Sequence, residues 1–491
     1  MPKRLKILAL APETPQIFGA GVRTYHFAKA LVAQAEVKLC VLGKEKPPGM
    51  PEDLAVACDW IRHLPADYRY ATGKNNGKAS AALRVIRTLL TPWRNGGEDM
   101  VLAWENQCLE RTADLSGGWK SLPRRVYAEV LRREVQFKMN LSGLLPKNTS
   151  FLAKPYNALL AEMLGQYNGG APDVIWFEHS ILFPFAKEMR RHFPEARLVC
   201  NAHNVEYCLQ RRVAQIAKAS SVRKWYEMQA EASRRIEQEA FKQCDLVFCC
   251  SEEDARLVRQ LSPRASVAVI PNGVDTNYFR PATETGNQRG PDGRSRPRLI
   301  FTGAMGYEPN CDAVGYFVRE ILPLVRQREP GCRFCIAGSG AQTRFGHLAQ
   351  TDPLIDIASD VADMRPYFEM SDVVVVPLRA GGGTRTKILE AMAMKRAVVS
   401  TSLGAEGIAL TPNVHLCLAD APADFAKRTI DLLRDEGGRQ KMEEAARHLV
   451  CQHYDWNRLM DEASGIFQQR AGAGQAPPEV AYLKTPLCDI K

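Results

Sequence analysis

The strongest chemical pattern in the chain is a glycine-rich segment between an apolar run and a helix-forming run. It reads Pro377-Leu-Arg-Ala-Gly-Gly-Gly-Thr-Arg-Thr-Lys-Ile-Leu-Glu-Ala-Met-Ala393. Consecutive glycines let backbone N–H groups approach a ligand closely, and a helix that begins beside them carries about half a positive charge at its N-terminus. We therefore expect an anion-binding loop in which Gly382 and Gly383 supply amides and Thr384 caps the helix.

Charged side chains follow this loop at helical spacing. Arg385 and Lys387 add positive charge, and Glu390 lies one helical turn beyond Lys387, where its carboxylate could accept two hydrogen bonds from a ribose diol. Taken alone, the segment leaves two interpretations open. It is either a phosphate and ribose site, or a glycine-rich loop followed by a surface Lys–Glu pair.

Two further candidate groups follow apolar runs in the first half of the chain. His203 comes directly after the run 198–202, and Glu178 and His179 come after the run 174–177. Ligands of open α/β sheets bind at the carboxyl ends of parallel strands, so we expect His203 at a binding site, with Glu178 and His179 lining the same cleft. A single histidine can equally be an ordinary loop residue.

Two other glycine turns are weaker signals. Gly19 and Gly21 open an apolar-periodic helix, but the third glycine of a dinucleotide fingerprint is missing. Gly338 and Gly340 follow another apolar run, where they either present amides to a nucleotide or form a simple turn.

The elements that must position these residues are short runs rich in Val, Ile and Leu, most of them separated by helix-length segments. Runs that are apolar on both faces are typical of parallel sheets covered by helices, and two series of them predict two doubly wound domains. The first series is 5–10, 37–42, 174–177, 198–202, 246–250 and 267–270, and the second is 299–304, 332–337, 355–358, 373–376, 397–401 and 415–418.

The chain's length of 491 residues also favours more than one domain. We predict an N-terminal Rossmann-like domain over residues 1–280, with a helical insertion at about 71–170 where the strand–helix rhythm stops. A Gly- and Pro-rich linker over 281–297 leads to a C-terminal Rossmann-like domain over 298–455. A crossover helix over 456–470 and a loosely held tail over 471–491 complete the chain.

Composition narrows the class of protein. The chain is 45% apolar and 24% charged, which is ordinary for a globular protein. Its formal net charge of +10 suits anionic small molecules, an anionic membrane surface or nucleic acid as partners, and charge alone does not choose among them. Scattered cysteines inside apolar runs, including Cys332 and Cys335, favour reduced core thiols and a cytoplasmic setting. No apolar stretch approaches the roughly 18 residues of a spanning helix. No Asp-x-Asp pair occurs, so nothing in the sequence calls for a metal.

Several ordered motifs resemble the retaining glycosyltransferases of family 4, which have the two-domain fold called GT-B. The glycine-rich segment with its Glu-Ala-Met-Ala helix matches the family, and so do Val269-Ile-Pro-Asn-Gly-Val-Asp275, Ser371-Asp-Val-Val-Val-Val-Pro377 and Ala397-Val-Val-Ser-Thr-Ser-Leu-Gly-Ala-Glu-Gly407. Phe301-Thr-Gly-Ala-Met-Gly-Tyr-Glu-Pro-Asn310 is most similar to bacterial members associated with exopolysaccharide assembly.

The resemblance implies roles for matching residues. A glutamate at the position of Glu390 binds the nucleotide ribose, and the amides of residues 382–384 contact the donor sugar and phosphates. His203 matches the active-site histidine that touches the donor sugar. The turn with Gly19 and Gly21 faces the diphosphate and acceptor, and Glu178 and His179 line the acceptor side of the cleft.

Two departures from the family pattern stand out. Gly382 replaces a second glutamate eight residues before Glu390, which leaves the identity of the sugar open. The loop after the first C-terminal strand offers Met305 and Asn310 instead of an Arg and a Lys. We hypothesise that Arg385 and Lys387 supply the missing charge.

The function so implied is transfer of a sugar from a nucleotide-diphosphate donor to a glycan or polyprenyl-linked acceptor, with retained anomeric configuration and no cofactor. The alternatives are a nucleotide-sugar epimerase or phosphorylase on the same fold, and a non-catalytic nucleotide-sugar-binding protein. A nicotinamide dehydrogenase and a nucleic-acid-binding protein lack supporting motifs. The basic insertion either docks on the inner leaflet of the membrane or is a solvated helical cap.

Overall fold

The computed structural model describes residues 5–11, 21–41, 59–61, 170–218, 220–282 and 298–472. Gly19, the expected helical insertion up to residue 169, most of the expected linker and residues 473–491 lie outside these ranges.

The N-terminal half is built on a seven-stranded sheet in the order β3-β2-β1-β4-β5-β6-β7, whose neighbouring strands all pair in parallel. The central strands are buried over most or all of their length, which explains their apolar sequences. The strands are β1 (Leu5–Ala11), β2 (Ala35–Val41), β3 (Asp59–Ile61), β4 (Val174–Glu178), β5 (Arg197–Asn201), β6 (Leu246–Cys249) and β7 (Val267–Val269).

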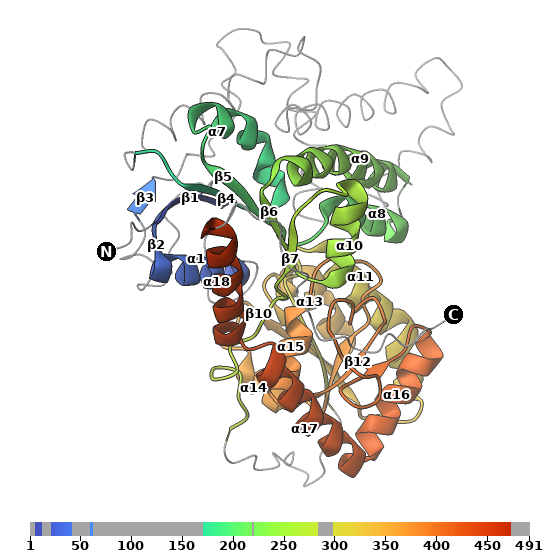
Figure 1. Ribbon diagram of the computed structural model, residues 1–491. Coiled ribbons are helices and arrows are strands. Elements are labelled where there is room, and N and C mark those ends of the chain that lie inside the picture. Colours follow the sequence, from blue (N-terminus) through green and yellow to red (C-terminus); the bar gives the residue numbers. More distant parts are fainter. Residues whose placement is uncertain are drawn as a thin grey trace, which may run out of the picture.

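Helices cover both faces of this sheet (Figure 1). One face forms an apolar core with α1 (Val22–Gln34). The other packs against the 3-10 helix η2 and helices α7, α9 and α10. The bounds are η2 (Ser180–Phe185), α7 (Ala186–His192), α8 (Glu206–Ile216), α9 (Ser220–Gln243) and α10 (Glu252–Leu261).

The C-terminal half repeats the design with a six-stranded parallel sheet in the order β10-β9-β8-β11-β12-β13. Its strands are β8 (Arg298–Thr302), β9 (Arg333–Gly338), β10 (Ile355–Ser359), β11 (Val373–Val376), β12 (Ala397–Ser400) and β13 (Cys417–Leu418). Its helices are α11 (Glu308–Tyr316), α12 (Leu322–Arg326), α13 (Ala341–Thr351), α14 (Arg365–Glu369), α15 (Thr386–Ala393), α16 (Pro422–Arg434) and α17 (Glu436–His453), and a π turn, η3 (Phe317–Ile321), joins α11 to α12.

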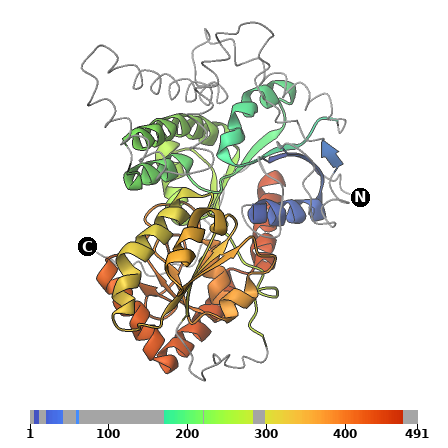
Figure 2. The ribbon, with the colours of Figure 1, turned by 180° about the vertical axis from the view of Figure 1, so that it is seen from behind.

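The last helix, α18 (Trp456–Gly472), crosses back to the first domain. Its apolar side joins the core formed by β1 and α1, with Trp456 fully buried there. The crossing is fixed by backbone hydrogen bonds, because Val274 N donates to Tyr454 O at 2.8 Å and Trp456 N donates to Val274 O at 3.2 Å. Figure 1 and the reverse view in Figure 2 both show α18 beside α1.

Two doubly wound parallel sheets confirm the predicted fold class, and each strand predicted from an apolar run is present to within a few residues. The short edge strand β3 was missed because Asp59-Trp-Ile61 has too few residues to show a pattern. In both sheets the order reverses beside the first strand, between β1 and β4 and between β8 and β11. Ligands of such sheets bind beyond the strand ends at this point. No helix among the described residues is long and apolar enough to span a membrane.

Candidate functional site

The glycine loop (residues 377–385) lies directly against the residues that follow β5. Gly383 has φ +66°, and a Cβ there would lie 2.7 Å from the carbonyl oxygen of His203. A Cβ added to Gly382 would lie 3.0 Å from the Cβ of Asn204. A side chain at residue 383 would therefore strain the backbone and push the two domains apart, which gives a physical reason for glycine there. The two strongest sequence candidates meet at this seam between the domains.

Thr384 makes a contact across the seam instead of capping a helix. Helix α15 begins at Thr386 with Arg385 as its N-cap, and no side chain caps it. The expected cap was therefore wrong by one residue, because the loop remains extended through Arg385. The buried hydroxyl of Thr384 instead donates to the carbonyl oxygen of Cys250 at 2.9 Å, at the end of β6.

Arg385 folds back on the glycine loop. Its guanidinium donates to the carbonyl oxygens of Gly382 and Gly383, and more weakly to that of Leu403 at 3.5 Å. The side chain is buried, which lowers the pKa of its guanidinium. Arg385 therefore holds the loop in shape through its hydrogen bonds to the loop carbonyl groups. Its positive charge lies directly beside the loop.

Lys387 and Glu390 do not form the surface ion pair considered from the sequence. The Lys387 ammonium donates to Asn310 Oδ1 at 2.8 Å and lies 4.0 Å from the centre of the Phe301 ring. Burial, and then the nearby charge of Arg385, lower the pKa of Lys387 to about 7. Burial raises the pKa of the Glu390 carboxyl to about 7, against the opposing charge of Lys387. Both groups can change charge near neutral pH, as site residues often do.

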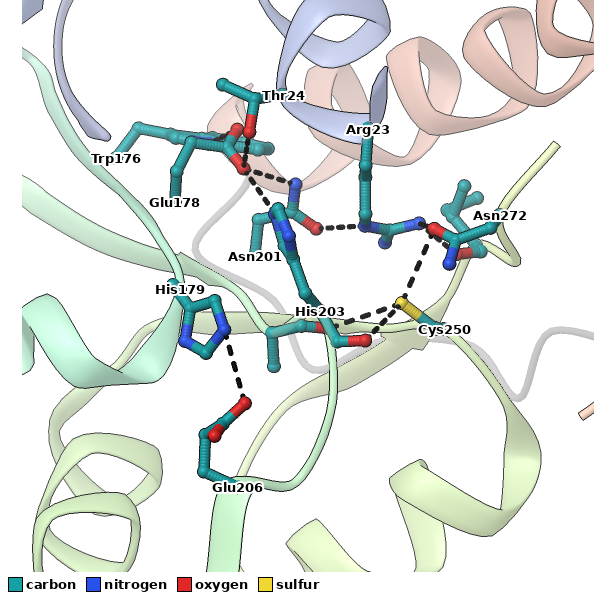
Figure 3. Close-up of polar contacts among 12 residues, drawn as sticks. Arg23, Thr24, Trp176, Glu178, His179, Asn201, His203, Glu206, Cys250 and Asn272 are labelled. Carbon is teal, nitrogen blue, oxygen red and sulfur yellow. Dashed lines mark hydrogen bonds and ion pairs between the residues drawn. The ribbon is translucent and has the colours of Figure 1, made fainter. Parts of the chain in front are cut away.

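The Glu178 carboxylate contacts the imidazole of His203 (Figure 3). Its Oε2 lies 2.9 Å from His203 Nε2 and accepts from Asn201 Nδ2 at 2.9 Å and Thr24 Oγ1 at 3.4 Å. Its Oε1 accepts from Trp176 Nε1 at 2.6 Å. Burial lowers the pKa of His203, although Glu178 opposes this shift. The carboxylate thereby orients the imidazole and is itself almost fully enclosed.

A second acid–imidazole pair lies beside the first. His179 Nε2 is 3.3 Å from Glu206 Oε1, and the rings of His179 and His203 have centroids 5.3 Å apart. His179 has φ +97°, a conformation that is uncommon for a residue other than glycine. Burial alone would raise the pKa of Glu206, but the charge of His179 and hydrogen bonds from His179 and Asn204 outweigh it and leave the pKa below its usual value.

Glu237, on α9, fixes the start of α8. Its carboxyl accepts the backbone N–H groups of Glu206 at 2.7 Å and Tyr207 at 3.0 Å, and the hydroxyl of Ser180 at 3.1 Å. Burial raises the pKa of Glu237 to about 8. A buried carboxyl on one helix thus caps another and sets the loop that carries His203. Within the described residues no three or more His, Cys, Asp or Glu side chains gather as metal ligands would.

Two of the remaining glycine candidates, Gly338 and Gly340, have structural reasons for being glycine. A Cβ on Gly338 would lie 2.0 Å from Gly303 O, so two loops approach each other too closely for any side chain. Gly340 adopts the left-handed conformation at the start of α13, and its N–H donates to Asp360 Oδ1 at 3.3 Å. Both observations favour the simple turn. Gly21 immediately precedes α1, whereas Gly19 lies outside the described residues.

Sequence reasoning missed several residues that join the two domains. Arg212 on α8 forms a two-point ion pair with Glu406 and donates to Gly381 O at 2.9 Å. Arg23 and Asn272 lie between the glycine loop and the residues around Glu178 and His203. Asn272 belongs to the Pro-Asn-Gly sequence of a motif quoted above, and Arg23 follows the glycine turn at Gly21. Nothing in one sequence shows which partners these side chains reach.

Comparison with known proteins agrees with this architecture. Residues 118–278 match Glycosyltransferase Family 4, and residues 296–435 match Glycosyl transferases group 1. The first match begins inside the expected insertion, at a residue outside the described ranges.

Solved structures with the same fold cover nearly the whole chain. Sucrose-phosphate synthase from Thermosynechococcus elongatus is 16% identical, with a TM-score of 0.58 over 95% of this chain and 99% of that one. HepE from Anabaena in complex with UDP is 13% identical, with a TM-score of 0.57 over 95% and 100% of the two chains. A glycosyltransferase from Rickettsia africae is 14% identical, with a TM-score of 0.56 over 96% and 99%. At these identities the likeness shows the fold.

A curated relative from Klebsiella pneumoniae is described as an uncharacterized 44.6 kDa protein in the cps region. It is 22% identical over 178 residues, which are 35% of this chain and 45% of that protein, so the match spans less than half of the relative's length. Taken with the two family matches and the paired parallel sheets, the comparisons show that the chain belongs to the group 1, family 4 glycosyltransferases and has the GT-B fold.

Proposed function

We propose that this glycosyltransferase moves a sugar from a nucleoside-diphosphate donor to a glycan or polyprenyl-linked acceptor during exopolysaccharide or cell-surface glycan synthesis. The observation that carries the proposal is the contact between Gly383 in the glycine loop and the backbone of His203. The HepE structures contain UDP, UDP with glucose, or UDP-glucose, which supports a uridine nucleotide as the first donor to test. The Klebsiella relative's place in a cps region supports a polysaccharide product.

The donor's diphosphate would bind the amides of residues 382–384, with the ribose diol at Glu390. Cleavage of the sugar–phosphate bond leaves negative charge on the departing phosphate, and fixed dipoles and cations lower the barrier by stabilising that charge. Arg385 holds the loop, and Lys387 lies two residues beyond its end, in the first turn of α15. His203, oriented by Glu178, would contact the donor sugar.

We further propose that the anomeric configuration is retained. In this mechanism the acceptor oxygen attacks the anomeric carbon from the face that the phosphate leaves. The bond from that carbon to the phosphate oxygen breaks, and the departing oxygen takes the acceptor proton. No covalent enzyme nucleophile is required, and the cations of the loop replace a bound metal. Turnover is therefore expected to be unchanged by EDTA, and the product is expected to keep the donor's anomeric configuration in NMR spectra.

The direct test is a panel of nucleotide sugars that includes UDP-glucose, incubated with purified protein and with polyprenyl-phosphate-linked or oligosaccharide acceptors. We expect release of nucleoside diphosphate that depends on His203 and on an acceptor. The His203→Ala variant should retain UDP affinity but turn over far more slowly, at a rate that is still measurable, and His347→Ala, which changes an exposed histidine, serves as the control. Absence of turnover with every donor, despite UDP binding, would support the non-catalytic binding protein instead.

The same assay separates the other reactions that this fold supports. An epimerase consumes the donor without a second sugar, and a phosphorylase requires inorganic phosphate. A donor consumed in the absence of any acceptor, with an isomeric nucleotide sugar as product, would replace the transferase proposal.

We also propose that the enzyme works on the cytoplasmic face of the membrane, where a lipid-linked acceptor would reach it. The basic segment at about 71–170 carries this proposal from sequence alone, since it lies almost entirely outside the described residues. Sedimentation with liposomes of anionic and of neutral lipid at low salt tests it. Equal recovery in the supernatant with both lipids would refute it.

A further inference from the structure

A buried arginine lies beside the seam between the two domains, close to the site. Arg23, at the start of α1, is only 3% exposed. Its Nε donates to Asn201 Oδ1 at 2.9 Å, and its Nη1 donates to Ile270 O at 2.8 Å and Asn272 Oδ1 at 3.2 Å. Figure 3 shows the guanidinium lying between Asn201 and Asn272, which come from different strand ends.

Both partners of Arg23 continue to the site residues. Asn201 Nδ2 donates to Glu178 Oε2 at 2.9 Å, and the same oxygen lies 2.9 Å from His203 Nε2. In the other direction, Asn272 Nδ2 donates to the carbonyl oxygen of Thr384 at 3.1 Å. A continuous line of hydrogen bonds therefore runs from the glycine loop across the seam to the imidazole of His203.

A thiol makes a second, shorter connection. Cys250 Sγ donates to His203 O at 3.1 Å and lies 3.7 Å from Asn272 Oδ1, and the carbonyl oxygen of Cys250 accepts from Thr384. Burial raises the pKa of Cys250 to about 12, so the thiol keeps its proton and remains a donor at neutral pH.

We infer that Arg23 and Asn272 are positioning residues that couple the seating of the glycine loop to the orientation of His203. The residue types fit this role. A planar guanidinium donates in two fixed directions at once, which an ammonium on a flexible stem does not reproduce. The Asn272 amide accepts from Arg23 and donates to Thr384 with opposite ends, whereas an aspartate could only accept.

The inference rests on the proposed function, since it assigns His203 to turnover. Its test combines Asn272→Ala with His203→Ala and measures kcat for release of nucleoside diphosphate from the nucleotide sugar of the panel that wild-type protein uses fastest. We expect Asn272→Ala to lower kcat about tenfold when His203 is present and to have little effect when it is absent, because residues of one network act non-additively. Asn277→Ala changes an exposed residue of the same loop and serves as the matched control.

A purely structural role predicts a different pattern. In that case Asn272→Ala lowers kcat by the same factor in both backgrounds, and this result would overturn the inference. Thermal unfolding of each variant reports loss of fold separately.

A second measurement needs no turnover and so distinguishes failure of the inference from failure of the proposed function. The ring resonances of His203 are followed by NMR as the pH changes. Glu178 and His179 from β4 and the residue after it, and Arg23 from α1, are the charged groups that act on this ring. Arg23→Gln removes a positive charge and should raise the pKa of His203. Asn272→Ala should shift the ring resonances, and Asn277→Ala should not. Unchanged His203 resonances in Asn272→Ala would refute the coupling even if no donor were found.

Discussion

Replacement of Gly383 by alanine tests whether the contact between the glycine loop and His203 matters. An alanine with φ near +66° pays a backbone penalty of about 1–2 kcal/mol, and its Cβ would lie 2.7 Å from His203 O. Relieving such an overlap in a packed region adds about 1–3 kcal/mol. The loop can avoid this second cost only by moving away from His203, and then the donor site opens.

Gly170→Ala is a matched control for the backbone penalty. Gly170 has φ +73°, but among the residues that the structure describes a Cβ there meets only Lys6 Nζ, at an ordinary contact distance of 3.7 Å. Both substitutions should lower Tm, by roughly 2–4 °C for each kcal/mol lost in a domain of this size. Only Gly383→Ala should in addition weaken UDP binding. Its Kd should rise about tenfold for each 1.4 kcal/mol of binding free energy that is lost when the loop moves.

The assays are thermal unfolding and titration calorimetry with UDP on both variants and wild-type protein. Equal losses of Tm in the two variants, together with unchanged UDP affinity in Gly383→Ala, would show that the loop does not depend on its contact with His203.

Two further predictions concern charged groups beside the loop. Because the pKa of Lys387 is lowered to about 7, its positive charge is present below that pH and is lost above it, so UDP affinity should fall as the pH rises through about 7. Calorimetry at several pH values should show that UDP affinity depends less on pH in Lys387→Met than in Lys395→Met. Identical curves for the two variants would remove Lys387 from the site. The other prediction concerns the ion pair of Arg212 with Glu406, which joins the two domains. Both side chains are about a quarter exposed, so Arg212→Met should destabilise the contact between the domains by about 1 kcal/mol. Small-angle scattering should then show a larger radius of gyration than in Arg234→Met, which breaks a pair within α9, and equal radii would contradict this role.

Sequence patterns were sufficient where the physics is local. Runs apolar on both faces predicted the parallel strands, and parallel sheets place the ends of those strands at one edge, which is why His203 and the glycine loop could be chosen. The helix start after the loop was misplaced, because Thr384 finds its partner Cys250 in the other domain rather than in its own helix. Contacts across a domain seam leave no periodic signal in a sequence.

The roles of the charged residues were also beyond a single sequence. Arg385 and Lys387 looked alike as cations near a phosphate site. In the fold Arg385 turns back onto loop carbonyl groups, whereas Lys387 reaches Asn310 over the Phe301 ring. Arg23 carried no signal beyond its place after a glycine turn, because its importance depends on Asn272, which is distant in sequence.

The decisive experiment is a crystal structure of the protein with UDP bound. We expect the diphosphate within hydrogen-bonding distance of the amides of residues 382–384, the ribose hydroxyls on Glu390, and His203 facing the terminal phosphate. A nucleotide bound elsewhere, with the glycine loop and His203 in contact but not involved in binding, would contradict it.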